Sequence, residues 1–305
     1  MRAVLAEGKA AFHPHFPAGF SGYNRPMLHY LYLDYGGLAK YRRELKYSLI
    51  SLRQEIAAEP DAQIVVYTDA PALYARWPVT VVDVAGKVGP WSGGGLYHHR
   101  IKPAVVLDAL NRFAAPVCFL DSDSIVRPGF HAEVTRKMTP QEVWSVTKRA
   151  VVMNGFELMN PFPPLKGFRT TLPHLGYYHY DVRQSWMYNS GLIGAAPEHA
   201  PLLEDTLAFI DALIGRARKF PTIEQFALSE VLRLSQTPVA EVKETFLHYW
   251  QGRRRIYMAG QIQKSLSPDW DDLTPPKEWA RMNYWAIRAY NYYHGIKTAF
   301  AGLVR

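Results

Sequence analysis

The chain has 305 residues and a mass of 34.7 kDa, enough for one large or two modest domains with a sizeable core. Its 35 Lys and Arg residues exceed its 27 Asp and Glu residues, and the net charge of +8 indicates an anionic partner. Hydrophobic residues make up 48% of the chain, which excludes a disordered protein. The single cysteine, Cys118, excludes an intramolecular disulfide and suits a reducing compartment.

The sequence also limits where the protein acts. No apolar run reaches the roughly 20 residues of a membrane-spanning helix. The first 17 residues carry Glu7, Lys9, His13 and His15 where a signal peptide has an apolar core. We therefore expect a cytoplasmic protein, either free or peripheral at the inner face of the membrane. Since no zinc-finger, basic-zipper or RNA-binding motif is present, nucleic acid is not an expected partner.

Strands and helices alternate in the first half of the chain. Apolar runs predict strands over 27–34, 62–69, 79–84 and 116–121. Apolar residues at helical spacing predict helices over 41–56 and 103–113. This alternation implies βαβ units, and therefore an α/β fold with a mixed, mostly parallel sheet flanked by helices.

The second half is less regular. Further strands are expected over 142–148 and 188–195, helices over 198–216 and 222–234, and a return to the sheet over 239–250. Prolines mark an irregular stretch from about 153 to 186, which we expect to supply the acceptor side of a site. We expect a single α/β domain over 1–275 and an aromatic, basic helix over 276–305.

The helix expected at the C-terminus has two interpretations. From Glu278 to Arg305, aromatic and apolar residues that include Trp279, Trp285 and Tyr292 follow helical spacing. Such a stripe packs against its own domain, or it lies on an anionic membrane surface near a lipid-linked acceptor.

Aspartates end three of the predicted strands, at Asp34, Asp69 and Asp121. Ligands of open α/β sheets bind beyond the carboxyl ends of the strands. The last strand continues as Asp121-Ser122-Asp123, and two carboxylates at this spacing can hold a divalent cation that bridges diphosphate oxygens. The alternative is a pair of ordinary turn carboxylates. A second Asp-x-Asp, at 269–271, has no apolar strand before it and indicates a solvated loop.

The segment 117–123 resembles the signature of GT-A-fold glycosyltransferases, in which an apolar strand leads into Asp-x-Asp and a metal binds a nucleotide-diphospho-sugar. Four other segments follow in the order typical of family 8, the glycogenin-like group. They are the strand end 32–35, Asn-Ser-Gly within 189–193, the pair 224–225 that opens a helix, and the histidine and glycine within 248–252.

This resemblance implies a role for each matching residue. Asp121, Asp123 and His248 would bind Mn²⁺ or Mg²⁺. Asn189, Glu224 and Gln225 would act at the sugar. The residues that the resemblance places at the donor are Asp34, Tyr35, Asp69, Arg100, Lys102, Ser122 and Gly191.

The chain departs from the family pattern in three places. One extra residue separates His248 from Gly252, Glu replaces Asp at 224, and Arg253-Arg254-Arg255 stands where Lys-Pro-Trp is usual. The three arginines neutralise a diphosphate, or they belong to a solvated loop.

The resemblance implies a metal-dependent glycosyltransferase that moves a sugar from a nucleotide-sugar, a UDP-sugar, to a hydroxyl of a glycan, lipid or lipopolysaccharide. One alternative is a nucleotidyltransferase that uses a nucleoside triphosphate, although residues 34–38 after the first strand carry no cation. Another is a non-enzymatic scaffold of the same fold.

Overall fold

The computed structural model describes residues 26–139, 141–143, 146–157, 165–217 and 220–280, and the single positions 285, 289 and 292. Its centre is a seven-stranded sheet. In spatial order the strands are β12 (Val239–Glu241), β8 (Val151–Glu157), β11 (Met187–Ala195), β4 (Val117–Leu120), β1 (Leu28–Asp34), β2 (Ala62–Thr68) and β3 (Thr80–Asp83).

Only β11 runs antiparallel to its neighbours in this sheet, and the other described pairings are parallel. The prediction of a mixed, mostly parallel sheet flanked by helices is confirmed. From β1 the chain moves outward to β2 and β3, then crosses back to β4 on the other side of β1. Such a reversal of strand order opens a crevice beyond the carboxyl ends of β1 and β4, where open α/β sheets bind their ligands.

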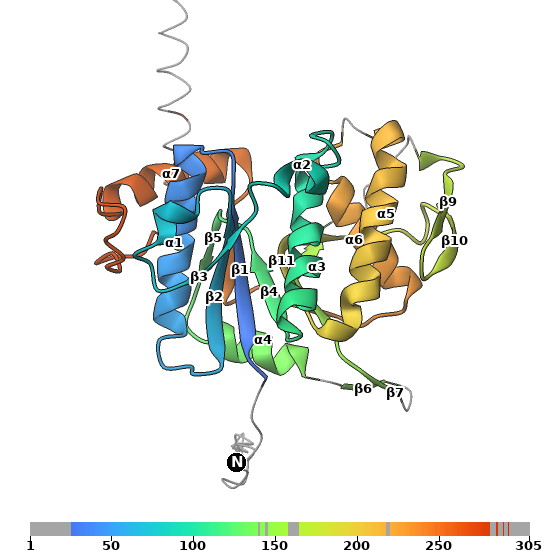
Figure 1. Ribbon diagram of the computed structural model, residues 1–305, viewed down its shortest axis with the longest axis horizontal. Helices are drawn as coiled ribbons and strands as arrows, with labels where there is room; N and C mark the ends of the chain where they lie inside the picture. Colours follow the sequence, from blue (N-terminus) through green and yellow to red (C-terminus); the bar gives the residue numbers. More distant parts are fainter. Residues whose placement is uncertain are drawn as a thin grey trace, which may run out of the picture.

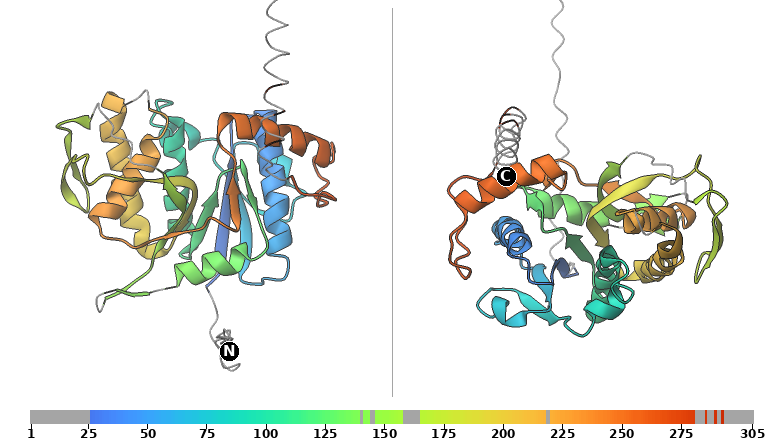
Figure 2. Two further views of the ribbon diagram at one scale, coloured as in Figure 1. Left: turned by 180° about the vertical axis from the view of Figure 1, so that it is seen from behind. Right: turned by 90° about the horizontal axis from the view of Figure 1, so that it is seen from above.

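Helices cover both faces of the sheet (Figures 1 and 2). On one face lie α1 (Ala39–Glu55) and α4 (Phe130–Met138), and on the other α3 (Ile101–Phe113), α5 (Ala200–Ala217) and α6 (Ile223–Leu234). The apolar stripe of α1 accounts for its position, since Leu45, Leu49 and Leu52 are each at most 1% exposed. Each such leucine contributes about 1.5–3 kcal/mol through burial.

The other elements surround this core. The short helices are η1 (Pro71–Tyr74), α2 (Val88–Trp91), η2 (His98–Arg100) and η4 (Pro197–His199), and α7 (Gly252–Ser265) packs against α1 (Figure 1). Three small sheets pair β5 (Ser124–Val126) with β13 (Phe246–His248), β6 (Gln141–Val143) with β7 (Val146–Lys148), and β9 (Arg169–Leu172) with β10 (Gly176–His179).

The strands expected over 142–148 are present as the β6–β7 hairpin, outside the main sheet. Three other expectations for the second half are corrected. Segment 239–250 supplies β12 and β13 to two different sheets. The stretch 153–186, expected to be irregular, contains most of β8 and all of β9 and β10. Asn154 and Gly155 interrupt the apolar run of β8, which hides its strand character from the sequence. Segment 253–255 begins α7 and is not a loop.

The helix expected over 276–305 is not formed at 276–280. Pro275 and Pro276 favour extended backbone there, and Trp279 packs edge-on against Tyr47 with ring centroids 4.9 Å apart. Trp285 and Tyr292 are helical and exposed, and the remainder of this prediction, 281–305 apart from 285, 289 and 292, lies outside the described residues.

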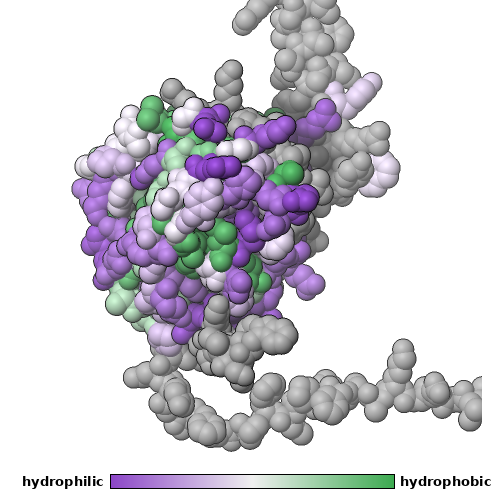
Figure 3. All heavy atoms as spheres, turned by 90° about the vertical axis from the view of Figure 1, so that its right-hand side faces the viewer, coloured by the Kyte–Doolittle hydropathy of each residue, from purple (hydrophilic) through white to green (hydrophobic). Residues whose placement is uncertain are grey.

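The described surface exposes scattered large apolar side chains, among them Trp186, Trp250 and Ile256. Figure 3 shows the side of the molecule with α5 and the β9–β10 hairpin, and this side is mainly hydrophilic with small apolar groups. Among the described helices, none has both the length and the apolar character to cross a membrane.

Candidate metal centre

Two carboxylates and one imidazole meet at the carboxyl edge of the central sheet. Asp121 and Asp123 lie in the turn from β4 to β5, and His248 ends β13, where it pairs with Ser124 of β5. Nε2 of His248 lies 3.2 Å from Oδ1 of Asp123 and 3.6 Å from Oδ2 of Asp121. One ligand atom from each residue lies within 4.8 Å of the other two. The β5–β13 pairing thus brings the C-terminal histidine to the Asp-x-Asp turn.

A hydrogen-bond chain holds the ring of His248 toward the two aspartates. The backbone N–H of Gly191 donates to Oδ1 of Asn189 at 2.8 Å, so this atom is an acceptor. The same oxygen lies 3.0 Å from Nδ1 of His248 and accepts from it when Nδ1 carries a proton. In that neutral form the lone pair of Nε2 faces the two aspartates, whereas a protonated Nε2 donates to Oδ1 of Asp123 at 3.2 Å. A metal-binding imidazole requires the neutral form, with one nitrogen free and the other donating to a fixed acceptor.

Gly191 leaves room for the imidazole. A Cβ atom at position 191 would lie 2.3 Å from both Nδ1 and Cε1 of His248, and 2.9 Å from Oδ1 of Asn189. Contacts below 3.0 Å are essentially never made by real Cβ atoms. Glycine is therefore required at position 191 because the His248 ring lies too close to leave room for a Cβ atom, and not because of the backbone conformation there.

Two cations, the buried Lys102 and the partly exposed Arg255, pair with the aspartates. Nζ of Lys102, at the start of α3, donates to Oδ2 of Asp121 at 2.9 Å and to the carbonyl of Ser190 at 3.1 Å. Nη1 of Arg255, in the first turn of α7, lies 2.9 Å from Oδ2 of Asp123, and its other nitrogens pair with Glu44 of α1. Each aspartate is thus held by a different helix.

These neighbours determine the ionisation of the site. Burial acts to raise the pKa of Asp123, but the hydrogen bond from His248 and the charges of His248 and Arg255 outweigh it and lower the pKa below its usual range. Burial likewise acts to lower the pKa of Lys102, and the carboxylates of Asp121 and Glu224 reverse this effect and raise it. A ligand carboxylate must be deprotonated to bind a metal, and Asp123 meets that condition at neutral pH.

The charged side chains around the two aspartates carry excess negative charge, which a bound cation would neutralise. The carboxylates of Asp121, Asp123, Glu44 and Glu224 lie around two cations, Lys102 and Arg255. With His248 neutral, two negative charges are unmatched within this group. Buried charge without compensation costs several kcal/mol. A divalent ion among Asp121, Asp123 and His248 matches that excess, and Mn²⁺ or Mg²⁺ accepts such oxygen and imidazole donors.

The residues assigned to the sugar lie beside the metal ligands. Glu224 and Gln225 open α6, where Oε1 of Gln225 accepts the backbone N–H of Ser190 at 3.2 Å. Oε1 of Glu224 accepts the Ser190 hydroxyl at 3.2 Å and lies 4.0 Å from Nζ of Lys102. Tyr97 donates to the other Glu224 oxygen. Strand β11 therefore connects Asn189, Glu224 and Gln225 to Asp121 through Ser190 and Lys102.

Several residues predicted to bind the donor contact other partners. Oδ2 of Asp34 accepts from Nε of Arg42 at 3.0 Å and from the hydroxyl of Tyr74 at 2.8 Å. Arg100 forms a two-pronged ion pair with Asp211, at 2.6 and 2.8 Å.

Of the remaining three predicted donor residues, Tyr35 and Asp69 lie near each other, just after the ends of β1 and β2. Asp69 accepts the backbone N–H of Gly36 at 2.8 Å, and Tyr35 stacks on His98 with ring centroids 6.2 Å apart. Ser122 lies between the two aspartates of the cluster. The described contacts thus join only Lys102 and Gly191, of the predicted donor residues, directly to the metal ligands.

Sequence reasoning missed Asn154 and Glu44, and it did not single out Arg255 among the three arginines. Asn154 of β8 lies 3.2 Å from both Oδ1 of Asn189 and Nδ1 of His248. Arg255 and Glu44 form the ion pair behind Asp123. The triple-arginine segment was a signal for Arg255, but only the helical phase of α7 shows that Arg255 turns inward while Arg253 and Arg254 are exposed.

Replacement of Lys102 tests the charge balance. We expect Lys102→Met to lower the free energy of unfolding by about 3 kcal/mol, because Asp121 and Glu224 lose their buried counter-ion. Urea unfolding with and without Mn²⁺ measures this, and Mn²⁺ should restore part of the loss. The matched control is Lys87→Met, whose side chain is 40% exposed and pairs with Asp108, with an expected cost under about 1 kcal/mol. Equal losses in the two variants would contradict a buried charge excess.

Comparisons with known proteins are sparse. No family model matches the chain, and no curated protein matches its sequence. Among solved structures 153 chains match. One is the crystal structure of mouse xyloside xylosyltransferase 1 in its apo form, at 12% sequence identity and a TM-score of 0.44, over 72% of this chain and 85% of that chain. A likeness this distant assigns no activity to the chain.

Proposed function

We propose that the chain is a metal-dependent glycosyltransferase. It transfers a sugar from a nucleotide-diphospho-sugar, a UDP-sugar, to a hydroxyl of a glycan, lipid or lipopolysaccharide. The observation that carries this proposal is the cluster of Asp121, Asp123 and His248 at the carboxyl edge of the sheet. A free imidazole lone pair, two carboxylates and an excess of negative charge fit a divalent ion there.

The donor diphosphate binds at this cluster. A bound Mn²⁺ or Mg²⁺ supplies positive charge to the diphosphate oxygens and stabilises the departing nucleoside diphosphate. Arg255 holds one oxygen of Asp123, which keeps the other directed at His248. Lys102 holds Asp121 from the opposite side. The ligand set is therefore fixed before the donor arrives, and such preorganisation lowers the cost of reaching the transition state.

The sugar lies next to β11 and the start of α6. Asn189 and Gln225 offer amide groups of the kind that bind sugar hydroxyls. Glu224 already accepts hydrogen bonds from Tyr97 and Ser190 and pairs with Lys102. We assign to this carboxylate, held in place by these contacts, the stabilisation of positive charge that develops at the anomeric carbon. We place the catalytic unit within residues 1–275 and the protein in the cytoplasm, free or at the inner face of the membrane.

A donor-turnover assay tests the proposal. The protein is incubated with Mn²⁺ and a panel of nucleotide-sugars, and release of the free nucleoside diphosphate is measured with and without EDTA. We expect UDP release from one UDP-sugar, abolished by EDTA and by Asp123→Asn. Pyrophosphate release from a nucleoside triphosphate would instead indicate a nucleotidyltransferase. Failure to bind any nucleotide in the presence of metal would indicate a scaffold, and either result overturns the proposal.

A further inference from the structure

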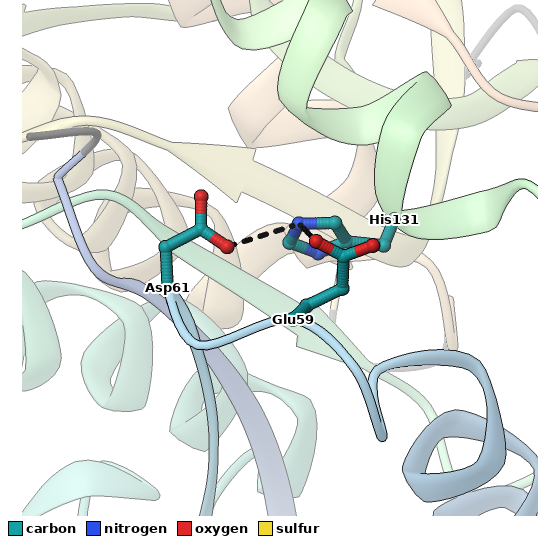
Figure 4. A group of neighbouring side chains, drawn as sticks. All are labelled: Glu59, Asp61 and His131. Carbon is teal, nitrogen blue, oxygen red and sulfur yellow. Dashed lines mark ion pairs between the residues drawn. The ribbon is translucent and has the colours of Figure 1, made fainter. Parts of the chain in front are cut away.

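A second group of metal-ligating side chains lies at the opposite edge of the central sheet. Glu59 and Asp61 lie in the connection from α1 to β2, and His131 lies in the first turn of α4 (Figure 4). Because β2 and β4 both run parallel to β1, the entry to β2 and the turn after β4 lie at opposite edges. One ligand atom from each of the three residues lies within 4.8 Å of the other two.

The ring of His131 is buried and directed at the two carboxylates. Its side chain is 4% exposed, and Nδ1 lies 2.9 Å from the hydroxyl of Tyr30. Nε2 lies 3.5 Å from the Thr135 hydroxyl, 3.6 Å from Oδ1 of Asp61 and 3.9 Å from Oε2 of Glu59. Among the described residues, only the Thr135 hydroxyl hydrogen-bonds Nε2, at the long limit of such a contact, and the two carboxylates lie beyond it. The nitrogen is thus weakly bound and faces both carboxylates.

Asp61 also directs a buried atom at this site, from the side opposite His131. Its Oδ1 atom is buried and accepts no hydrogen bond from any residue that the structure describes. A buried carboxylate oxygen without a donor costs about 1–3 kcal/mol or more. Two buried atoms that can each donate a lone pair, an imidazole nitrogen and a carboxylate oxygen, thus face each other across 3.6 Å. Ligands of one tetrahedral metal ion are about 3.4 Å apart, so little movement is needed for both to bind one ion.

We infer that Glu59, Asp61 and His131 form a site for a divalent transition-metal ion, with water in the remaining positions. One imidazole and two carboxylates suit Zn²⁺ or Mn²⁺, whereas Ca²⁺ prefers six to eight oxygen ligands. Nδ1 then carries the proton and donates it to the Tyr30 oxygen, the supporting contact that ligating histidines require. Glu55 accepts the backbone N–H of His131 at 3.2 Å and adds negative charge nearby. The ion links the α1–β2 connection to α4 and stabilises this edge of the sheet.

Zinc binding to a background without the first cluster tests this site. The Asp121→Asn/Asp123→Asn variant is dialysed against Zn²⁺, and bound zinc and the thermal midpoint are measured. We expect one equivalent of zinc and a higher midpoint. Adding Glu59→Gln and Asp61→Asn should weaken zinc binding at least about 100-fold, since two ligands are lost. The matched control is His174→Gln/Glu204→Gln, an exposed imidazole–carboxylate pair 2.6 Å apart, which should leave zinc binding unchanged.

A single variant and a diffraction measurement test the zinc site even if the variants of buried residues do not fold. If the variants of the buried residues do not fold, Glu59→Gln alone serves, because this side chain is 41% exposed. Anomalous diffraction at the zinc edge then locates the ion. Absence of zinc from the background variant, or zinc that persists after Glu59→Gln/Asp61→Asn, overturns the inference. UDP binding with Mn²⁺ is measured in parallel and should not change in Glu59→Gln, so this site and the proposed transferase site are tested separately.

Discussion

Asp123→Asn is expected to abolish the metal-dependent part of UDP binding. Asparagine keeps the shape of the side chain but removes the negative charge that faces Nε2 of His248 at 3.2 Å. Loss of a contact that only supports a metal ligand costs 10–100-fold in affinity, so loss of a ligand itself should cost at least about 100-fold. UDP affinity measured with Mn²⁺ should fall to the value that wild type shows in EDTA.

The second Asp-x-Asp provides the control for this variant. Asp269 is exposed in a turn, and Asp269→Asn should leave UDP affinity unchanged. The fold should survive Asp123→Asn, because Arg255 keeps its pair with Glu44. A folded Asp123→Asn protein that binds UDP and Mn²⁺ as wild type does would remove Asp123 from the site.

Gly191→Ala is expected to displace His248 and so to impair both stability and donor binding. The added methyl group would lie 2.3 Å from two ring atoms of His248. Overpacking of this kind costs about 1–3 kcal/mol. The imidazole must move away from the aspartates to relieve the clash, so UDP affinity in Mn²⁺ should fall about tenfold or more. Thermal unfolding and calorimetric titration of the same preparation measure the two effects.

A double-mutant cycle distinguishes this cause from a general disturbance of β11. In a His248→Ala background the ring is absent, and Gly191→Ala should then cost little further stability. Gly215→Ala is the control, since nothing lies within 4 Å of a Cβ at this helical position, and alanine there should stabilise α5 by about 0.5–1 kcal/mol. Equal costs of Gly191→Ala with and without His248 would show that the ring is not what the glycine accommodates.

Local patterns predict the first half of the fold well. The strands at Leu28–Asp34 and Ala62–Thr68 and the helix α1 are continuous apolar or periodic segments, and each forms within a few residues of its predicted bounds. The second half depends on pairings that no local pattern specifies. Strand β8 is interrupted by Asn154 and Gly155, and its strand character comes from its position between β11 and β12.

The candidate site can also be predicted only in part: the sequence indicates the metal ligands but not the ion pairs around them. The Asp-x-Asp turn and His248 stand out in the sequence, and the structure brings them together, although their roles stay predictions. Arg100 and Asp34 also stand out, but their charges are matched by Asp211 and Arg42, partners that only the folded chain identifies. The sequence does not single out Arg255 among the three arginines for the same reason, because its partner Glu44 lies 211 positions away.

The most direct test of the account is calorimetric titration of UDP into the wild-type protein, first with Mn²⁺ and then with EDTA. We predict one UDP bound per chain with Mn²⁺ and an affinity at least about 100-fold lower in EDTA, because the diphosphate is bound through the ion held by Asp121, Asp123 and His248. Equal UDP affinity in the two buffers, or no UDP binding with Mn²⁺ present, would contradict it.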